Sequence, residues 1–135
     1  MKKLVRVSMF YMIFGLISGV YYREFTKLFN YSKETQLSTL HTHILVLGMF
    51  FFLIVLLLEK NFQLTRHKNY KKFFAIYNSG LGITLLVMII NGTLTVLGKS
   101  LGAAISGIAG LGHIVLTIGL GYFFNVLFDS VELDD

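Results

Sequence analysis

Four long apolar stretches, separated by short polar connections, set the pattern of residues along the chain. They cover approximately residues 4–22, 40–58, 73–97 and 101–128. Each is about 19 residues or longer, which matches the ~20 apolar residues that an α-helix needs to cross the hydrocarbon core of a bilayer. The pattern therefore predicts an all-α fold, a bundle of four transmembrane helices that forms a single domain over residues 1–135.

The first apolar stretch begins, like a signal peptide, with basic residues. It is long, however, and it ends in the bulky sequence Val-Tyr-Tyr-Arg at residues 20–23. A signal peptide ends in a small-residue cleavage site, so we expect a helix that is retained in the protein. Gly15 and Gly19 form a GxxxG pattern in this helix, which predicts close contact with another helix.

The composition agrees with a membrane protein. The chain is 55% hydrophobic and 14% charged, which is typical of a polytopic membrane protein rather than of a soluble domain. It contains no cysteine, which excludes disulfides, thiolate metal sites and cysteine nucleophiles. The basic residues that give the net charge of +5 sit near the ends of the apolar stretches, so they predict contact with a lipid bilayer and not with nucleic acid.

The distribution of Lys and Arg predicts the orientation. If the N-terminus and the connection after the second span are cytoplasmic, eight of the 12 Lys and Arg residues lie inside and four outside. The inner set is Lys2, Lys3, Arg6, Lys60, Arg66, Lys68, Lys71 and Lys72, and the outer set is Arg23, Lys27, Lys33 and Lys99. The positive-inside rule then favours an N-in/C-in topology in the plasma membrane.

Three histidines lie within the predicted spans: His41 and His43 at the start of the second, and His113 in the fourth. An ionisable side chain in a span costs on the order of 2–3 kcal/mol on insertion scales, so it usually faces the bundle interior and has a function there. The alternative for each is a neutral histidine that bonds to a helix carbonyl or to a nearby threonine. His67 lies among loop lysines, and we expect it to be solvated.

Helix geometry separates the two histidines of the second span. Residues two apart on an α-helix are rotated by about 200°, so His41 and His43 project to nearly opposite sides and cannot bind one ion together. A zinc site needs three or four converging ligands, and the predicted spans contain no Asp, Glu or Cys to supply them. Haem remains as the candidate cofactor, because its iron accepts one or two axial histidines in an otherwise apolar site.

The fourth span is rich in glycine and other small residues around His113. At helical spacing, Ser106, Ala109, Gly110 and Thr117 share a face with His113, and they leave room for a flat group beside the imidazole. Close helix packing through small residues explains the same glycines, and the two explanations are compatible. His113 is thus an alternative or additional iron ligand.

The sequence around the two histidines resembles a known motif. His-Thr-His-Ile-Leu-Val-Leu-Gly at residues 41–48 is similar to the H-x-H helix of subunit I of the heme-copper oxidases. There, one histidine faces the low-spin haem and the other faces the high-spin haem. The stretch also resembles the H-x-H pattern of small bacterial four-helix proteins allied to that subunit and to the membrane nitric-oxide-response proteins.

This resemblance implies an architecture. The oxidase subunit consists of three four-helix units, so three copies of this chain would form a homotrimer with haem between His41 of one copy and His43 of the next. It also implies that Lys99, with Tyr22 and Arg23 as a second outer-face pair, would bind the haem propionates. Ordinary interfacial anchoring explains these three residues equally well. The further histidines of the oxidase copper site are missing, so copper and dioxygen reduction are not implied.

The sequence thus predicts a haem-b-binding integral membrane protein of the bacterial plasma membrane. Two axial histidines would suit electron transfer with a redox partner, whereas an open sixth position would suit binding of a diatomic gas. The alternative is a cofactor-free module, either a small transporter subunit or an assembly factor, whose histidines serve proton transfer or packing. No acid–base pair or nucleophile constellation in the spans predicts a stand-alone enzyme.

Overall fold

The computed structural model describes residues 1–100 and 102–132, and all the regular structure in this part of the chain is helical. The elements are α1 (Lys2–Leu28), α2 (Leu37–His43), the π-helix η1 (Ile44–Phe50), α3 (Phe51–Phe62), the 3₁₀ turn η2 (Leu64–Arg66), α4 (Tyr70–Val96) and α5 (Ala103–Glu132). Because α2, η1 and α3 form one continuous helix, these residues contain four helices long and apolar enough to cross a membrane, as the sequence predicts.

The helices are longer than the predicted spans. The polar segment 23–39 was expected to be a connection, but α1 continues through its first part to Leu28 and the second helix already begins at Leu37. The second helix also continues past Glu59 to Phe62. A 27-residue helix is about 40 Å long, so its polar ends extend beyond ~30 Å of hydrocarbon into the headgroup region.

The fourth helix is shifted relative to its predicted span of 101–128. The predicted start, Leu101, lies outside the described residues. In the part that is described, α5 begins at Ala103 and continues past Phe128 to Glu132. The third helix differs least, since α4 covers Tyr70–Val96 where 73–97 was predicted.

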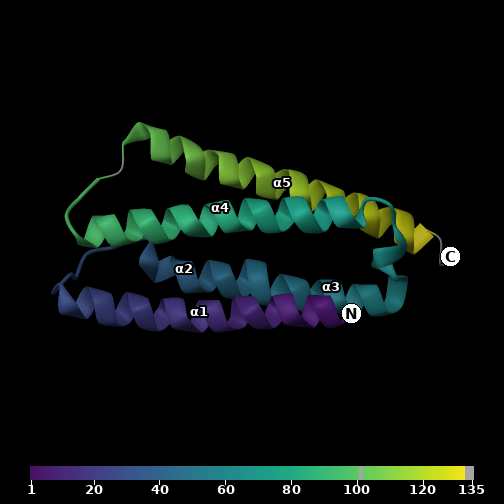
Figure 1. Ribbon diagram of the computed structural model, residues 1–135, viewed down its shortest axis with the longest axis horizontal. Coiled ribbons are helices and arrows are strands. Elements are labelled where there is room, and N and C mark those ends of the chain that lie inside the picture. The colour runs from purple at the N-terminus through teal and green to yellow at the C-terminus, as the bar shows by residue number, and fades with distance from the viewer. Residues whose placement is uncertain (101, 133–135) are drawn as a thin grey trace.

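The helices form an open stack rather than a closed square. In Figure 1, α1 lies beside the continuous helix α2–η1–α3, α4 packs on that pair, and α5 covers the far side of α4. Both ends of the chain lie near the α3–α4 connection, while the α1–α2 and α4–α5 connections lie at the opposite end. Towards that opposite end, α5 diverges from α4.

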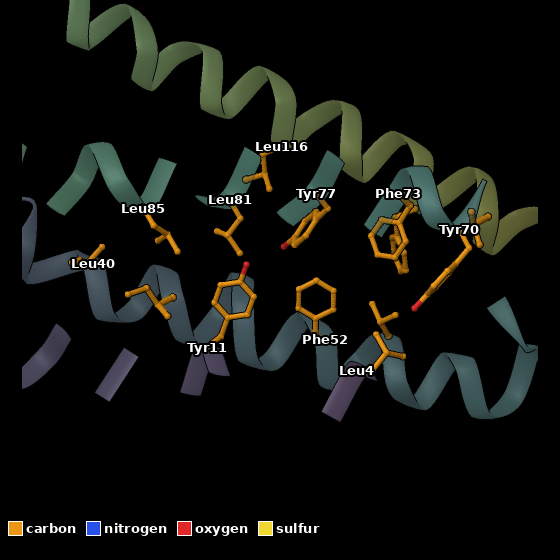
Figure 2. Packing of buried hydrophobic residues seen from close by; sticks show 14 of the residues in the cluster. Leu4, Tyr11, Leu40, Phe52, Tyr70, Phe73, Tyr77, Leu81, Leu85 and Leu116 are labelled. Carbon is orange, nitrogen blue, oxygen red and sulfur yellow. The ribbon is translucent and has the colours of Figure 1, made fainter. Parts of the chain in front are cut away.

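An aromatic cluster holds α3, α4 and α5 together near the α3–α4 connection. Phe52, Phe73 and Tyr77 are fully buried. The ring of Phe51 stacks on Tyr77 with the centroids 4.2 Å apart, and it meets Phe123 of α5 edge-on at 5.2 Å. Figure 2 shows Phe52, Phe73 and Tyr77 between the layers, with Leu81 and Leu85 continuing the row along α4. Large stacked rings thus fill this end of the bundle.

The π-helix η1 directly follows His43 and was not predicted from the sequence. In a π-helix, each N–H donates to the carbonyl five residues earlier. The carbonyl groups therefore point in other directions than they would in an uninterrupted α-helix. Side chains of neighbouring helices donate to two of these carbonyls: Tyr77 Oη to Leu47 O at 2.8 Å, and Ser8 Oγ to Met49 O at 3.0 Å. The π segment is therefore held from both sides by hydrogen bonds.

The glycines of α1 and η1 allow the first two helices to approach each other closely. A Cβ at Gly15 would lie 2.7 Å from Leu45 Cδ2, and one at Gly19 would meet the side chain of His41 at 3.7 Å. The close contact predicted from GxxxG is therefore confirmed. Gly48, the glycine that ends the H-x-H pattern, lies directly against the ring of Tyr11.

We predict that Gly48→Ala destabilises the bundle, because the new methyl group would overlap the Tyr11 ring. Overpacking of this kind costs about 1–3 kcal/mol. The matched control is Gly82→Ala in α4, where a Cβ meets nothing within 4 Å and helix propensity alone would add slight stability. Thermal unfolding in detergent, followed by circular dichroism, measures both. Equal midpoints for the two variants would contradict the packing argument.

Candidate functional site

The three histidines of the predicted spans lie in three different environments. His41 faces α1, with its side chain against Gly19. Its Nδ1 is buried without a hydrogen-bond partner, and its Nε2 is 3.5 Å from Thr42 Oγ1. The residue as a whole is half-buried. A buried nitrogen without a partner costs about 1–3 kcal/mol, so the position of Nδ1 comes at the expense of stability.

His43 lies on the other side of the helix and is half-buried. Its Nδ1 is 3.0 Å from the carbonyl oxygen of Thr39, one turn earlier. A carbonyl oxygen only accepts, so Nδ1 carries a proton, and in the neutral ring Nε2 keeps its lone pair. A main-chain carbonyl on the other ring nitrogen is a common arrangement for a metal-binding histidine, since it fixes both the tautomer and the ring orientation.

His113 repeats this arrangement on α5. Its Nδ1 donates to the carbonyl oxygen of Ala109 at 2.8 Å, and the side chain is exposed on the surface of the bundle. Thr117 Oγ1 donates to the main-chain oxygen of His113 and leaves the ring free. In their neutral forms, His43 and His113 therefore both have a lone pair on Nε2.

A cavity of about 190 Å³ lies where α5 diverges from α4. We call it the α2–α5 cavity, because its lining joins the start of α2 to α5 across α4. Its lining residues are Gln36, Val87, Asn91, Ile105, Ser106 and Ala109. Two of the small residues predicted to share a face with His113, Ser106 and Ala109, are among them, whereas His113 is not.

A second, more polar cavity of about 440 Å³ adjoins it at the α1–α2 connection and shares Gln36. The other residues that line it are Glu34, Thr35, Ser38, Thr39 and Thr95. All four hydroxyl groups donate to main-chain carbonyls, so towards the cavity they present mainly acceptor oxygens. This lining is unsuited to carboxylates such as haem propionates.

The three residues predicted to bind haem propionates lie in two different places in the bundle. Tyr22 and Arg23 follow Gly19 by three and four residues on α1, which places them on the side of His41. The Arg23 side chain is 81% exposed and lies 3.7 Å from Glu24. Lys99 is exposed in the α4–α5 connection, at the end of the bundle that holds both cavities. The structure brings none of the three into contact with a histidine ring through any hydrogen bond among the described residues.

Within residues 1–100 and 102–132, no three His, Cys, Asp or Glu side chains converge as a metal-binding group. A zinc or copper centre built by one chain therefore has too few ligands in this region.

Sequence reasoning missed a polar network at the α3–α4 connection. His67 was expected to be solvated, but its side chain is only 11% exposed, and its Nε2 lies 2.8 Å from Asp129 Oδ2 on α5. The main-chain N–H of Asn69 donates to His67 Nδ1, and the Asn69 amide donates to Asn125 Oδ1. The expectation was wrong because Asp129 is 62 residues away from His67 in sequence, and only the packing of α5 brings the two side chains together.

We predict that His67→Ala lowers the stability of the bundle, because it removes the hydrogen bond to Asp129 that ties the connection to α5, and the local bond from the Asn69 N–H as well. Loss of a hydrogen bond that involves a charged group costs about 1.5–3 kcal/mol. Glu24→Gln is the control, since it removes an ion pair between two exposed side chains. Thermal unfolding midpoints in detergent compare the two. If both variants unfold at the wild-type temperature, the network does not stabilise the fold.

Comparison with known proteins identifies the family of the chain. A family model described as a protein of unknown function, DUF2871, matches residues 1–130. The chain belongs to this family. No curated protein and no solved structure matches it. The matched range includes the first three long helices, α5 except for its last two residues, and all three histidines of the spans, so the site described above lies within the region that defines the family.

Proposed function

We propose that this DUF2871 protein is a haem-b-binding integral membrane protein of the heme-copper-oxidase-like type. The observation that carries the proposal is the state of His43. Its Nδ1–H donates to Thr39 O, so the ring is fixed and Nε2 is free to bind a metal on a half-buried, mostly apolar side of the helix. Haem bound at this position would supply an iron whose oxidation state or sixth ligand can change.

The other donors fit the same group. His113 has the same tautomer as His43, and the lack of a three-ligand cluster in the described residues suits a cofactor that brings four nitrogen ligands of its own. His41 stays a candidate ligand on the opposite side of the helix, with Tyr22 and Arg23 near it. Lys99 is the candidate for a propionate on the side of His43.

The proposal includes a membrane orientation. Four apolar helices support a multi-pass arrangement, and the excess of Lys and Arg at the α3–α4 end favours an N-in/C-in topology in the plasma membrane. The two cavities and the H-x-H sequence would then face the outer leaflet.

The natural lack of cysteine allows a direct test of this orientation. We expect Ser32→Cys, in the α1–α2 connection, to react with a membrane-impermeant maleimide on intact cells. Asn61→Cys, at the exposed end of α3, should react only after lysis, and the cysteine-free parent is the blank. The opposite labelling pattern would reverse the topology.

We also propose that the protein is a homo-oligomer, and a trimer by its resemblance to the three-unit oxidase subunit. Gly107, Gly110 and Gly121 of α5 support a contact between copies, because nothing lies within 4 Å of a Cβ built at any of them. Small residues on a lipid-facing helix surface permit close packing of a second helix. Cyclic symmetry would repeat one such contact around a closed ring.

Haem binding is tested on the purified protein. We expect material expressed with ample haem to show a Soret band and a reduced-minus-oxidised difference spectrum typical of haem b. His43→Ala should lose most of the bound haem or change its coordination, because it removes the nitrogen that Thr39 O orients. The haem-to-protein ratio, from the pyridine haemochrome assay, is the measurement.

His67→Ala is the matched control, because it removes a histidine at the other end of the bundle that is paired with Asp129. It should keep the wild-type haem content even if it is less stable. A wild-type protein without a Soret band would overturn the proposal and favour the cofactor-free module. Equal haem loss in both variants would mean that the fold, and not the ligand, was disturbed.

A further inference from the structure

One exposed stripe of α1 changes from basic to apolar along the helix. Its members follow one another at alternating spacings of three and four residues and are Lys3, Arg6, Phe10, Ile13 and Ile17. This spacing places them on one side of the helix. The first two are charged, and the three apolar side chains are 62%, 47% and 61% exposed. A phospholipid that lies along a helix has the same order, a charged headgroup followed by hydrocarbon.

An aromatic ring of α4 holds the first charge of this stripe in place. The Lys3 ammonium group lies 4.0 Å from the centroid of the Phe74 ring, where the electrons of the ring face attract a cation. Phe74 is fixed in turn, because its ring centroid is 5.6 Å from that of Phe52 and 6.3 Å from that of Tyr70. Lys3 is exposed, so its N–H groups on the side away from the ring can donate to a ligand.

The start of α4 adds another positive charge beside this contact. Lys71 is exposed and precedes Phe74 by three residues, so both lie on the same side of α4. Both α1 and α4 begin at the end of the bundle that holds the α3–α4 connection (Figure 1). Lys3 and Lys71 therefore lie at one junction between the two helices, with Arg6 one turn further along α1. We call these three residues the α1–α4 basic site.

No carboxylate of the described residues forms an ion pair with the α1–α4 basic site. The ion pairs within residues 1–100 and 102–132 join Arg23 to Glu24 and His67 to Asp129. Glu59 lies at the same end of the bundle, but both of its carboxylate oxygens accept hydrogen bonds from the residue six positions later in the chain. Three cations in one place, without an anion among these residues, create a positive potential that attracts a negatively charged ligand.

The α1–α4 basic site lies at the depth of the lipid headgroups. Its residues are within the first two turns of α1 and α4, and each of these helices has 27 residues, more than the ~20 that cross the hydrocarbon core. In the proposed N-in orientation, this end faces the cytoplasmic leaflet. Basic residues between transmembrane helices on that side are suited to anionic headgroups.

We infer that the α1–α4 basic site binds the phosphate of an anionic phospholipid, whose acyl chain lies along Phe10, Ile13 and Ile17. The guanidinium group of Arg6 can donate two parallel hydrogen bonds to phosphate oxygens, and the two lysines add point charges. A zwitterionic headgroup carries a cation of its own, which finds no carboxylate of the described residues at this junction. This inference goes beyond the proposed haem function and does not depend on it.

Lipid titration followed by native mass spectrometry tests the site on the full chain in a non-ionic detergent. We expect wild-type protein to bind phosphatidylglycerol more tightly than phosphatidylcholine with the same acyl chains. Lys3→Gln/Arg6→Gln/Lys71→Gln should bind phosphatidylglycerol on the order of 10–100-fold more weakly, because it removes three charges near the headgroup. Equal wild-type affinity for the two lipids would overturn the inference.

The matched control removes the same charges elsewhere at the same end of the bundle. Arg66→Gln/Lys68→Gln/Lys72→Gln also replaces one arginine and two lysines, and Lys72 points to α5, with its ammonium group 6.0 Å from the Tyr122 ring centroid. It should keep the wild-type affinity for phosphatidylglycerol. Equal weakening by both triple variants would mean that binding follows the net charge of this end, and the assigned site would be wrong.

Two further measurements test the ring and the acyl chain. Phe74→Leu keeps all three charges but removes the ring face, so it should weaken phosphatidylglycerol binding about two- to fivefold, whereas Phe74→Tyr should bind like wild type. Unchanged affinity in Phe74→Leu would contradict the role of the ring in positioning Lys3. Inorganic phosphate has no acyl chain and should not displace the lipid at equal concentration. Full displacement by phosphate would identify an anion site rather than a lipid site.

Discussion

Tyr77 is the residue on which the arrangement of the helices depends. Its hydroxyl donates to Leu47 O in the π-helix, its ring stacks on Phe51, and its main chain lies against Gly119 of α5. One residue thus contributes to the distance and register of three helices. In an apolar interior, an unpaired hydroxyl or carbonyl group is costly, so the hydrogen bond favours one register over its neighbours.

The two ends of the bundle differ in how closely α5 packs on α4. Near Tyr77, stacked rings and the glycine contacts hold α5 tightly on α4. Towards Ala103, where small side chains replace the rings, α5 diverges and the α2–α5 cavity forms.

The H-x-H segment has a structural role beside its proposed chemistry. Gly48 admits the ring of Tyr11, and the π-helix begins immediately after His43. Short π segments in longer helices occur frequently at functional sites. Here the segment anchors the histidine-bearing turn to α1 and α4 through Ser8 and Tyr77, so the rings of His41 and His43 are held on opposite sides of a helix that cannot rotate freely.

The sequence alone determined four apolar helices, the close approach at Gly15 and Gly19, and the opposite directions of His41 and His43. These properties follow from local periodicity, which a single helix contains. Only the tertiary structure decided that the side chain of His41 packs against Gly19 of α1 and that His67 pairs with Asp129. These relations depend on the register between helices, which side chains distant in sequence fix through packing and hydrogen bonds.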